Sequence, residues 1–325
     1  MIRAEHLSKR YGAIYALDDV SFEIGEGEIV GLLGPNGAGK TTTMNILTGY
    51  LSATAGEAFI DGTNILENPA AAKKKIGYLP EQPPLYPEMT VWEYLNFVYE
   101  LKGCTFPREA HLGEIMDVVK IGDVRGRLIG NLSKGYRQRV GIASALVGDP
   151  PVLIFDEPTV GLDPKQIIEV RNLLRTLGKR HTVILSTHIL PEVQAVCERI
   201  IVISRGQIVA NERTEDITRV MESDTRYRLK ISGGAAKDIL AALRERRGVS
   251  RVEQLPERDG ESYAFLAEAK GDTDIRKMIF ALCVEKGWVL MGMERVGLAL
   301  EDVFLRLVDR AERGKDPLTK KKKGK

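Results

Sequence analysis

A glycine-rich segment of eight residues, Gly34–Thr41, constrains the fold of this chain more than any other feature. It reads Gly-Pro-Asn-Gly-Ala-Gly-Lys-Thr and fits the phosphate-loop pattern of glycine, any four residues and Gly-Lys-Ser or Gly-Lys-Thr. The apolar run Ile29–Leu33 precedes it and a helix-like stretch follows, which is the strand–loop–helix context that such a loop needs. We therefore predict an α/β fold around this loop and regard a chance glycine-rich turn as the less favoured interpretation.

The loop also predicts a chemistry. Its glycines let successive backbone N–H groups curl around phosphates, and the following helix adds partial positive charge from its N-terminus. Lys40 is expected to reach the β- and γ-phosphates, and the hydroxyl of Thr41 to ligate Mg²⁺. The pattern indicates nucleotide binding, but by itself it does not distinguish kinases, GTPases and ATPases.

An acidic pair, Asp156 and Glu157, follows a second apolar run, Val152–Phe155. At the end of a buried strand, Asp156 would lie beside the metal and Glu157 at the strand tip, where it could polarise an attacking water. The simpler alternative is an acidic pair that ends a strand at a solvated loop. The phosphate loop upstream favours the catalytic interpretation.

The segment Leu132–Arg139 contains a second candidate anion site. Ser133 can cap the following helix, whose apolar face would carry Val140, Ala143 and Leu146. The Ser133 hydroxyl, the Gly135 N–H and the helix N-terminus together suit an anion. Two phosphate-binding elements in one chain suggest that one of them serves a nucleotide held by a second copy.

At this segment the chain resembles the ATP-binding subunit of ABC transporters. The family signature is usually Leu-Ser-Gly-Gly-Gln. This chain keeps its serine and second glycine as Ser133 and Gly135, but has Lys134 in place of the first glycine and Tyr136 in place of the glutamine. The resemblance covers roughly residues 1–215, with each family motif present once and in order. Translation-factor relatives carry two such cassettes in one chain, and chromosome-maintenance relatives insert a long coiled coil between the motifs. This sequence shows neither feature.

The resemblance implies ATP and Mg²⁺ as ligands and assigns site residues. Glu157 would polarise water, while His188 and Lys40 would stabilise the transferred phosphoryl group. Mg²⁺ would be held by Thr41, Gln82 and Asp156, and the second protomer would contribute Ser133, Gly135 and Asp163. The remaining ATP contacts would come from Tyr11, Gly34, Pro35, Asn36, Gly37, Ala38, Gly39, Lys40, Thr41 and Thr42.

Two of these assignments rest on single side chains. Tyr11 would stack on adenine, with packing on a strand as the alternative. Gln82 would couple the site to the membrane partner. The other histidines, His6, His111 and His181, stand in no comparable context and receive no role.

Three softer segments, Pro84–Val91, Ser133–Arg139 and Leu300–Leu305, resemble the ABC-2 type exporter group of drug, antibiotic, sodium and gliding-motility ATPases. That branch implies a homodimer on two separately encoded ABC-2 type permease subunits, peripheral to the cytoplasmic face of the inner membrane, with ATP hydrolysis driving export. Two alternatives stay open: an importer ATPase with a solute-sensing C-terminal domain, and a non-transport regulatory ATPase.

The pattern restarts after about residue 215. Strand- and helix-like stretches from Tyr227 to Met293 follow the order β-α-β-β-α-β, which predicts a small α+β, ferredoxin-like domain. We expect an ATPase domain with a mixed sheet over 1–215, with a helical subdomain at about 84–149 whose first helix begins with a capping box of Thr90 and Glu93. A linker over 216–223, an accessory domain over 224–311 and a disordered basic tail over 312–325 complete the prediction.

The end of the chain carries two weaker patterns. Leu300, Val303, Phe304 and Leu307 recur at helical spacing and predict a helix packed on its own or a twin domain rather than on a membrane partner. The lysines of 320–325 are expected to be solvated, with contact to anionic lipid of the inner leaflet as the less favoured interpretation.

Composition narrows the class further. Lysine and arginine number 47 against 45 acidic residues, a formal charge of +2, which argues against a nucleic-acid partner. No apolar run approaches the roughly 18 residues of a membrane-spanning helix, and the first residues show no signal-peptide pattern. The three cysteines, Cys104, Cys197 and Cys283, are too far apart to suggest a disulfide framework or a zinc motif.

Overall fold

The computed structural model describes residues 1–216, 226–271 and 273–296. The chain divides into two compact units, Met1–Thr214 and Glu215–Lys325. Each unit has its own hydrophobic core. The core of the first unit is built from residues between Ile2 and Ile208, and that of the second from residues between Tyr227 and Met293. The finer predicted limits of helical subdomain, linker and tail stay predictions.

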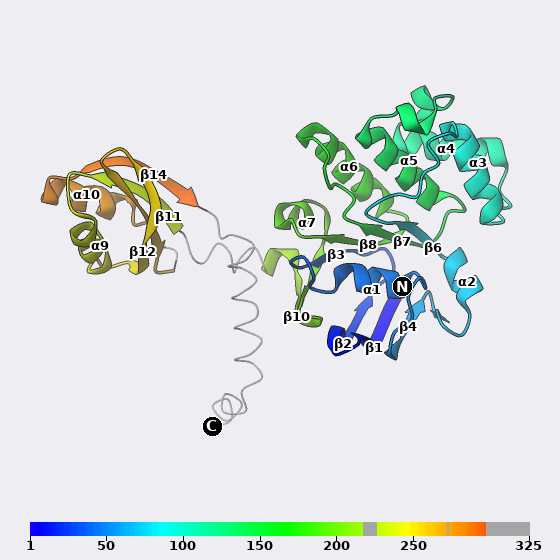
Figure 1. Ribbon diagram of the computed structural model, residues 1–325, viewed down its shortest axis with the longest axis horizontal. Coiled ribbons are helices and arrows are strands. Elements are labelled where there is room, and N and C mark those ends of the chain that lie inside the picture. The colour runs from blue at the N-terminus through cyan, green and yellow to red at the C-terminus, as the bar shows by residue number, and fades with distance from the viewer. Residues whose placement is uncertain (217–225, 272, 297–325) are drawn as a thin grey trace. The chain divides into compact units, whose positions relative to one another are not determined.

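A six-stranded sheet in the order β10-β9-β3-β8-β7-β6 forms the centre of the first unit (Figure 1). Five strands run parallel, and β10 forms an antiparallel hairpin with β9. All residues of β3, β7 and β8 are buried, which is usual for parallel strands covered on both faces. The strands are β3 (Ile29–Leu33), β6 (Ile76–Leu79), β7 (Val152–Asp156), β8 (Thr182–Thr187), β9 (Arg199–Ser204) and β10 (Gln207–Arg213).

A second, antiparallel sheet has the strand order β2-β1-β4-β5, and α1 (Lys40–Leu47) lies between this sheet and the six-stranded one. Met44 and Leu47 of α1 are fully buried and share one core with residues of both sheets. Sequence patterns did not predict this sheet, because register shifts interrupt β1 at several points and break the alternation of buried and exposed residues. Its strands are β1 (Ile2–Tyr11), β2 (Ile14–Ile24), β4 (Ala55–Ile60) and β5 (Thr63–Asn64).

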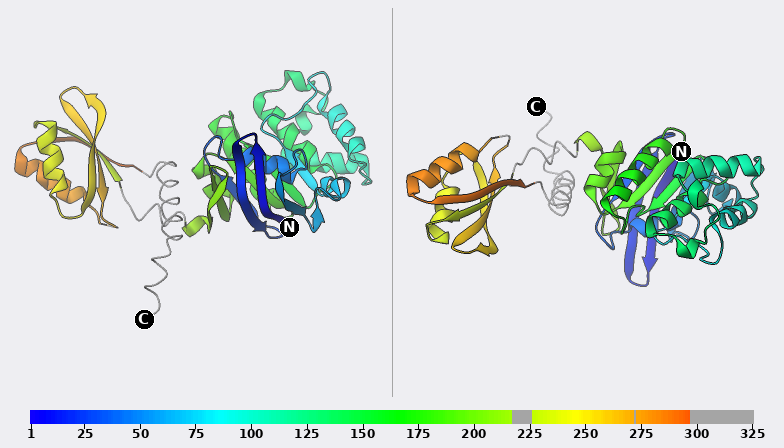
Figure 2. Two further views of the ribbon diagram at one scale, coloured as in Figure 1. Left: turned by 60° about the horizontal axis from the view of Figure 1, so that its bottom comes forward. Right: turned by 90° about the horizontal axis from the view of Figure 1, so that it is seen from above.

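Helices cover the other face of the parallel sheet and form a separate layer at one end (Figures 1 and 2). The predicted capping box is confirmed at α3, where Thr90 accepts from the Glu93 N–H and Glu93 accepts from the Thr90 N–H. The predicted Ser133 cap of α5 is confirmed as well. The helices are α2 (Pro69–Lys74), α3 (Val91–Leu101), α4 (Arg108–Val119), α5 (Lys134–Leu146), α6 (Pro164–Leu177) and α7 (Leu190–Val196).

The second unit has the predicted ferredoxin-like order. Its four antiparallel strands are arranged β12-β13-β11-β14, so the first strand lies between the third and the fourth. Ile239 of α9 and Ile279 of α10 share the core on one face of this sheet with Leu229 and Phe265 of its strands (Figure 2). The elements are β11 (Arg226–Ser232), α9 (Ala236–Arg244), β12 (Val249–Asp259), β13 (Ser262–Ala269), α10 (Arg276–Lys286) and β14 (Val289–Val296).

The predicted C-terminal helix with Leu300 to Leu307, the exporter-like segment Leu300–Leu305 and the basic tail lie outside the described residues. Within the residues that are described, no helix has both the length and the apolar character to cross a membrane.

Candidate functional site

The glycine-rich loop joins β3 to α1 and wraps the side chain of Lys40. The Lys40 ammonium donates to the carbonyl oxygens of Gly34 at 2.8 Å and Pro35 at 3.2 Å. Gly39 has φ +112°, and a Cβ there would lie 2.7 Å from the Ala16 carbonyl oxygen. Only glycine permits both this conformation and this approach. The loop is therefore held in a curled shape before any ligand enters.

The acidic pair stands at the carboxyl end of β7. Asp156 is 1% exposed and accepts a hydrogen bond from the Ser186 hydroxyl. The parallel register explains this contact, because Asp156 of β7 lies directly opposite Ser186 of β8. Glu157 adopts a left-handed backbone with φ 50°, and its N–H donates to the carbonyl and hydroxyl oxygens of Ser186, each at 3.2 Å. Left-handed backbone costs a non-glycine residue about 1–2 kcal/mol, so the surroundings hold Glu157 in a strained position.

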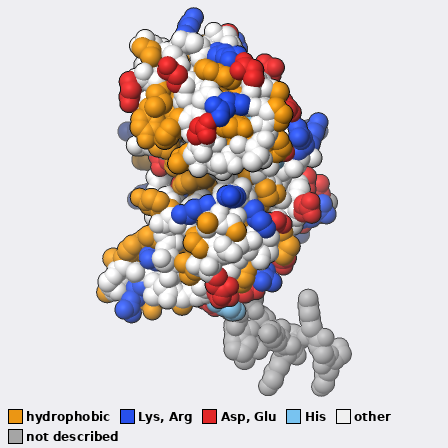
Figure 3. All heavy atoms as spheres, turned by 90° about the vertical axis from the view of Figure 1, so that its right-hand side faces the viewer, with side chains coloured by type: hydrophobic (Ala, Val, Ile, Leu, Met, Phe, Trp, Pro, Cys, Tyr) orange, Lys and Arg blue, Asp and Glu red, His pale blue; other side chains and the backbone are white. Residues whose placement is uncertain are grey.

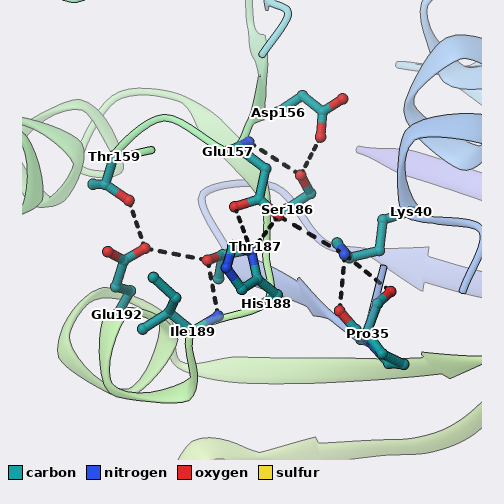
Figure 4. A network of polar contacts seen from close by, with 11 residues as sticks. Pro35, Lys40, Asp156, Glu157, Thr159, Ser186, Thr187, His188, Ile189 and Glu192 are labelled. Carbon is teal, nitrogen blue, oxygen red and sulfur yellow. Dashed lines mark hydrogen bonds and ion pairs between the residues drawn. The ribbon is translucent and has the colours of Figure 1, made fainter. Parts of the chain in front are cut away.

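His188 and Lys40 face the Glu157 carboxylate from two sides (Figure 4). His188 Nδ1 lies 3.0 Å and 3.2 Å from the two carboxylate oxygens. Because a carboxylate only accepts, Nδ1 must carry the proton in this contact, which leaves Nε2 free to face the pocket. The Lys40 ammonium lies 3.8 Å from Glu157 Oε1. Burial lowers the pKa of Lys40, while the negative charges of Glu157, Asp156 and Glu81 counteract this shift.

These groups surround one pocket. Its lining is Ala16, Asn36, Gly37, Gly39, Lys40, Thr41, Thr42, Glu81, Glu157, Val160 and His188. The structure therefore brings most of the predicted phosphate-loop residues together with Glu157 and His188. Gly34 and Pro35 do not line the pocket, but their carbonyl oxygens accept hydrogen bonds from Lys40. Asp156 is buried and is not part of the lining.

Other predicted residues lie elsewhere. Tyr11 ends β1, is 51% exposed and has the Lys9 ammonium 5.4 Å from its ring centroid. Gln82 is exposed in the loop after β6, and its neighbour Glu81 lines the pocket instead. Neither Tyr11 nor Gln82 contributes to the lining as the chain stands.

Ser133, Gly135 and Asp163 form a second cluster outside the pocket lining. Ser133 begins α5 and Asp163 begins α6, where a capping box joins Asp163 to Gln166. A Cβ at Gly135 would lie 2.5–2.8 Å from the side-chain atoms of Gln166, so the first turns of α5 and α6 pack together. The three residues predicted to serve a second protomer's nucleotide thus lie at the adjoining starts of two helices, with Ser133 and Asp163 exposed and Gly135 buried.

Several residues escaped the sequence analysis. Ala16 and Val160 line the pocket, and four buried polar side chains support it: Gln138, Thr159, Ser186 and Glu192. Thr159 lies two residues after Glu157 and Ser186 two residues before His188, so proximity to the motifs was the one available signal. Gln138 and Glu192 lie in helices, where a polar residue is usually solvated, and the sequence offers no signal for their burial.

The donor set fits Mg²⁺ as a companion of a nucleotide. Thr41 offers an exposed hydroxyl at the first turn of α1, and Asp156 offers a carboxylate at the end of β7. Oxygen ligands are those that Mg²⁺ prefers, and this ion usually takes one or two protein ligands together with phosphates and water.

The strand, curled glycine loop, helix and adjacent acidic pair define a P-loop nucleotide-binding protein. A family model described as ABC transporter matches residues 17–160. "Uncharacterized ABC transporter ATP-binding protein YxlF" of Bacillus subtilis (strain 168) is 32% identical over 95% of this chain and 99% of its own length. "Linearmycin resistance ATP-binding protein LnrL" of the same organism is 35% identical over 72% of this chain and 76% of its own length.

Solved structures agree with these relatives. "Dimeric Structure of MJ0796, a Bacterial ABC Transporter Cassette" superposes with a TM-score of 0.61 at 31% identity, over 66% of this chain and 99% of that one. The chain belongs to the ABC transporter ATP-binding proteins, a family whose cassettes hydrolyse ATP, dimerise and work with transmembrane partners.

Proposed function

We propose that this chain is the ATPase subunit of an exporter, and that two copies form two composite ATP sites head to tail. The observation that carries the proposal is the separation, within one chain, of two clusters of residues that are predicted to bind phosphate. Lys40, Glu157 and His188 line the pocket, while Ser133 and Gly135 lie outside its lining. A second copy in reversed orientation would place Ser133 and Gly135 over the γ-phosphate held by the first.

In this arrangement each side chain has a defined task. Lys40, released from the carbonyls of Gly34 and Pro35, would reach the β- and γ-phosphates. Glu157 would accept a hydrogen bond from the attacking water and orient it in line. His188, with both ring nitrogens protonated, would donate Nδ1–H to Glu157 and Nε2–H to the γ-phosphate. Mg²⁺, held by Thr41 and Asp156 with Gln82 moving in, would neutralise phosphate charge.

Hydrolysis would then open the dimer, because the shared charge contacts to the γ-phosphate disappear. The helical segment offers a surface for passing this motion to a permease. Figure 3 views the first unit from the side of this helical segment and shows hydrophobic side chains on that surface. Tyr86 and Phe97, 43% and 39% exposed, meet edge to face at 5.6 Å, and Leu101 and Leu128 are exposed as well. Exposed apolar clusters of this kind suit a protein partner.

Export through ABC-2 type permease subunits at the cytoplasmic face of the inner membrane is the finer part of the proposal. The exporter-like segments after Gln82 and around Ser133 support it, and so does the name of LnrL, a resistance protein. A cell gains resistance when a harmful compound is moved outward.

Mixing two inactive variants tests the composite site. Lys40→Met would disable the loop of one copy and Ser133→Arg the second anion site of the other. In a mixed dimer, the altered loop of one copy faces the altered second anion site of the other, so both changes fall in one composite site. The other composite site is built from unaltered residues only. We expect each variant alone to be inactive and the mixture to recover up to about half of the activity per mixed dimer. No recovery, with mixed dimers demonstrated by differential tags, would refute the head-to-tail arrangement.

Export is tested in cells that lack the chain. We expect such cells to accumulate the transported compound, and expect the wild-type chain, but not Glu157→Gln, to restore efflux. Loss of uptake instead would favour the importer alternative, and an unchanged distribution with altered regulation would favour the non-transport one.

A further inference from the structure

Glu192 is a buried carboxylate that the proposed reaction does not use. It lies in the first turn of α7 and is 4% exposed. Its Oε2 accepts hydrogen bonds from the hydroxyls of Thr159 at 2.5 Å and Thr187 at 3.2 Å. Within the described parts of the chain, no lysine, arginine or histidine forms an ion pair with it. A buried carboxyl group whose side-chain partners are two hydroxyls needs an explanation.

The two hydroxyls connect Glu192 to both halves of the catalytic contact. Thr159 follows Glu157 by two residues, and Thr187 directly precedes His188. The contact of His188 with Glu157 closes a ring that runs through Thr159, Glu192 and Thr187 (Figure 4). The loop after β7 and the turn after β8 are therefore tied at two points, once at the reacting groups and once behind them.

The ring adds to the hydrogen bonds that hold two segments at this point. Glu157 has a strained backbone, and the turn at His188 is fixed by the Ile189 N–H, which donates to the Thr187 hydroxyl at 3.1 Å. Gln138 of α5 donates to the Pro158 carbonyl at 2.9 Å. Gln138 and Glu192 thus both hold the short loop after β7, and both are buried.

Placement matters for the chemistry, because an error of about 1 Å in a reacting group can cost a factor of about 10² in rate. Resting on the proposed function, we infer that Glu192 is a positioning residue: through Thr159 and Thr187 it sets the placement of Glu157 relative to His188. It does not line the pocket, so in the proposed reaction it would contact neither the nucleotide nor the attacking water. Its loss should therefore lower kcat and leave ATP binding nearly unchanged.

The geometry selects the variants. Both hydroxyls donate to one oxygen, so Glu192→Gln can keep an acceptor in the same place, while Glu192→Met keeps the length and removes it. We expect Glu192→Met to lower kcat tenfold or more with KM for ATP within twofold, and Glu192→Gln to restore most of the loss. Thr159→Val, of nearly the same shape, should also lower kcat. The matched control is Thr176→Val on the surface of α6, which should change nothing.

Steady-state ATP hydrolysis by the full chain, with fluorescent-nucleotide binding and thermal unfolding alongside, decides the matter. Wild-type kcat in Glu192→Met, or equal damage in Glu192→Gln and Glu192→Met, overturns the positioning role. If Glu192→Met does not fold, wild-type kcat in Thr159→Val overturns it equally.

Glu157→Gln in the same assay separates the two proposals. Wild-type turnover in Glu157→Gln would remove the proposed role of Glu157 itself. Lost turnover in Glu157→Gln together with unchanged Glu192→Met and Thr159→Val would remove only the positioning role.

Discussion

Replacing Glu157 by glutamine changes one charge at the centre of the site and almost no volume. The carboxylate lies 3.8 Å from the Lys40 ammonium, which corresponds to an attraction of about 4 kcal/mol at an effective dielectric constant of 20. In the variant this attraction is lost and the pocket becomes more positive by one charge. ATP carries negative charge into the same place, so we expect its affinity to be retained or increased.

Turnover should respond in the opposite direction. A positioned general base contributes about 10²–10⁴ to a rate, equivalent to roughly 3–5 kcal/mol of barrier. Glu157→Gln should therefore lose at least two orders of magnitude in phosphate release at saturating ATP. Since dimer opening follows hydrolysis in the proposed cycle, the variant should accumulate as an ATP-bound dimer, measurable by light scattering on a size-exclusion column.

Glu169→Gln is the matched control. Glu169 lies on α6, pairs with Arg139 and does not line the pocket, so the same substitution there should leave turnover unchanged. Wild-type phosphate release in Glu157→Gln would refute the assignment of the base. Loss of ATP binding would show that the carboxylate maintains the loop rather than activating water.

Three predictions concern stability, and thermal or denaturant unfolding measures each of them. Thr90→Ala removes the capping box of α3 and should cost about 1 kcal/mol with ATP binding intact; an unchanged midpoint would contradict the cap's contribution. Phe265→Ala should destabilise the second unit by about 3–5 kcal/mol and leave the cassette's ATP affinity unaltered, and a lower affinity would show that the units are coupled. Burial lowers the pKa of Lys102 to about 8, below its usual 10.5, so the unfolded chain binds more protons between these values and stability should rise with pH there. Lys102→Met should flatten that rise.

Local patterns predicted much of the fold. The loop at Gly34–Thr41, the strands β3 and β7, the caps at Thr90 and Ser133 and the β-α-β-β-α-β order all depend on residues close in sequence. The antiparallel sheet of β1, β2, β4 and β5 was missed, because bulges break the alternation on which strand prediction relies.

The sequence alone was enough to propose which residues carry the chemistry: a glycine loop before a helix, an acidic pair after a strand and a histidine after another strand. Their types and spacing follow from short stretches of chain. It could not determine how Glu157 meets His188, 31 residues away, or why Glu192 is buried.

Those contacts depend on the parallel register of β7 and β8, which sets Asp156 opposite Ser186 and brings the two following turns together. Register arises from packing both faces of the sheet at once, and such packing exists only in the folded chain. The geometry of the site, including the separation of the pocket from the cluster of Ser133, Gly135 and Asp163, therefore comes from the tertiary structure.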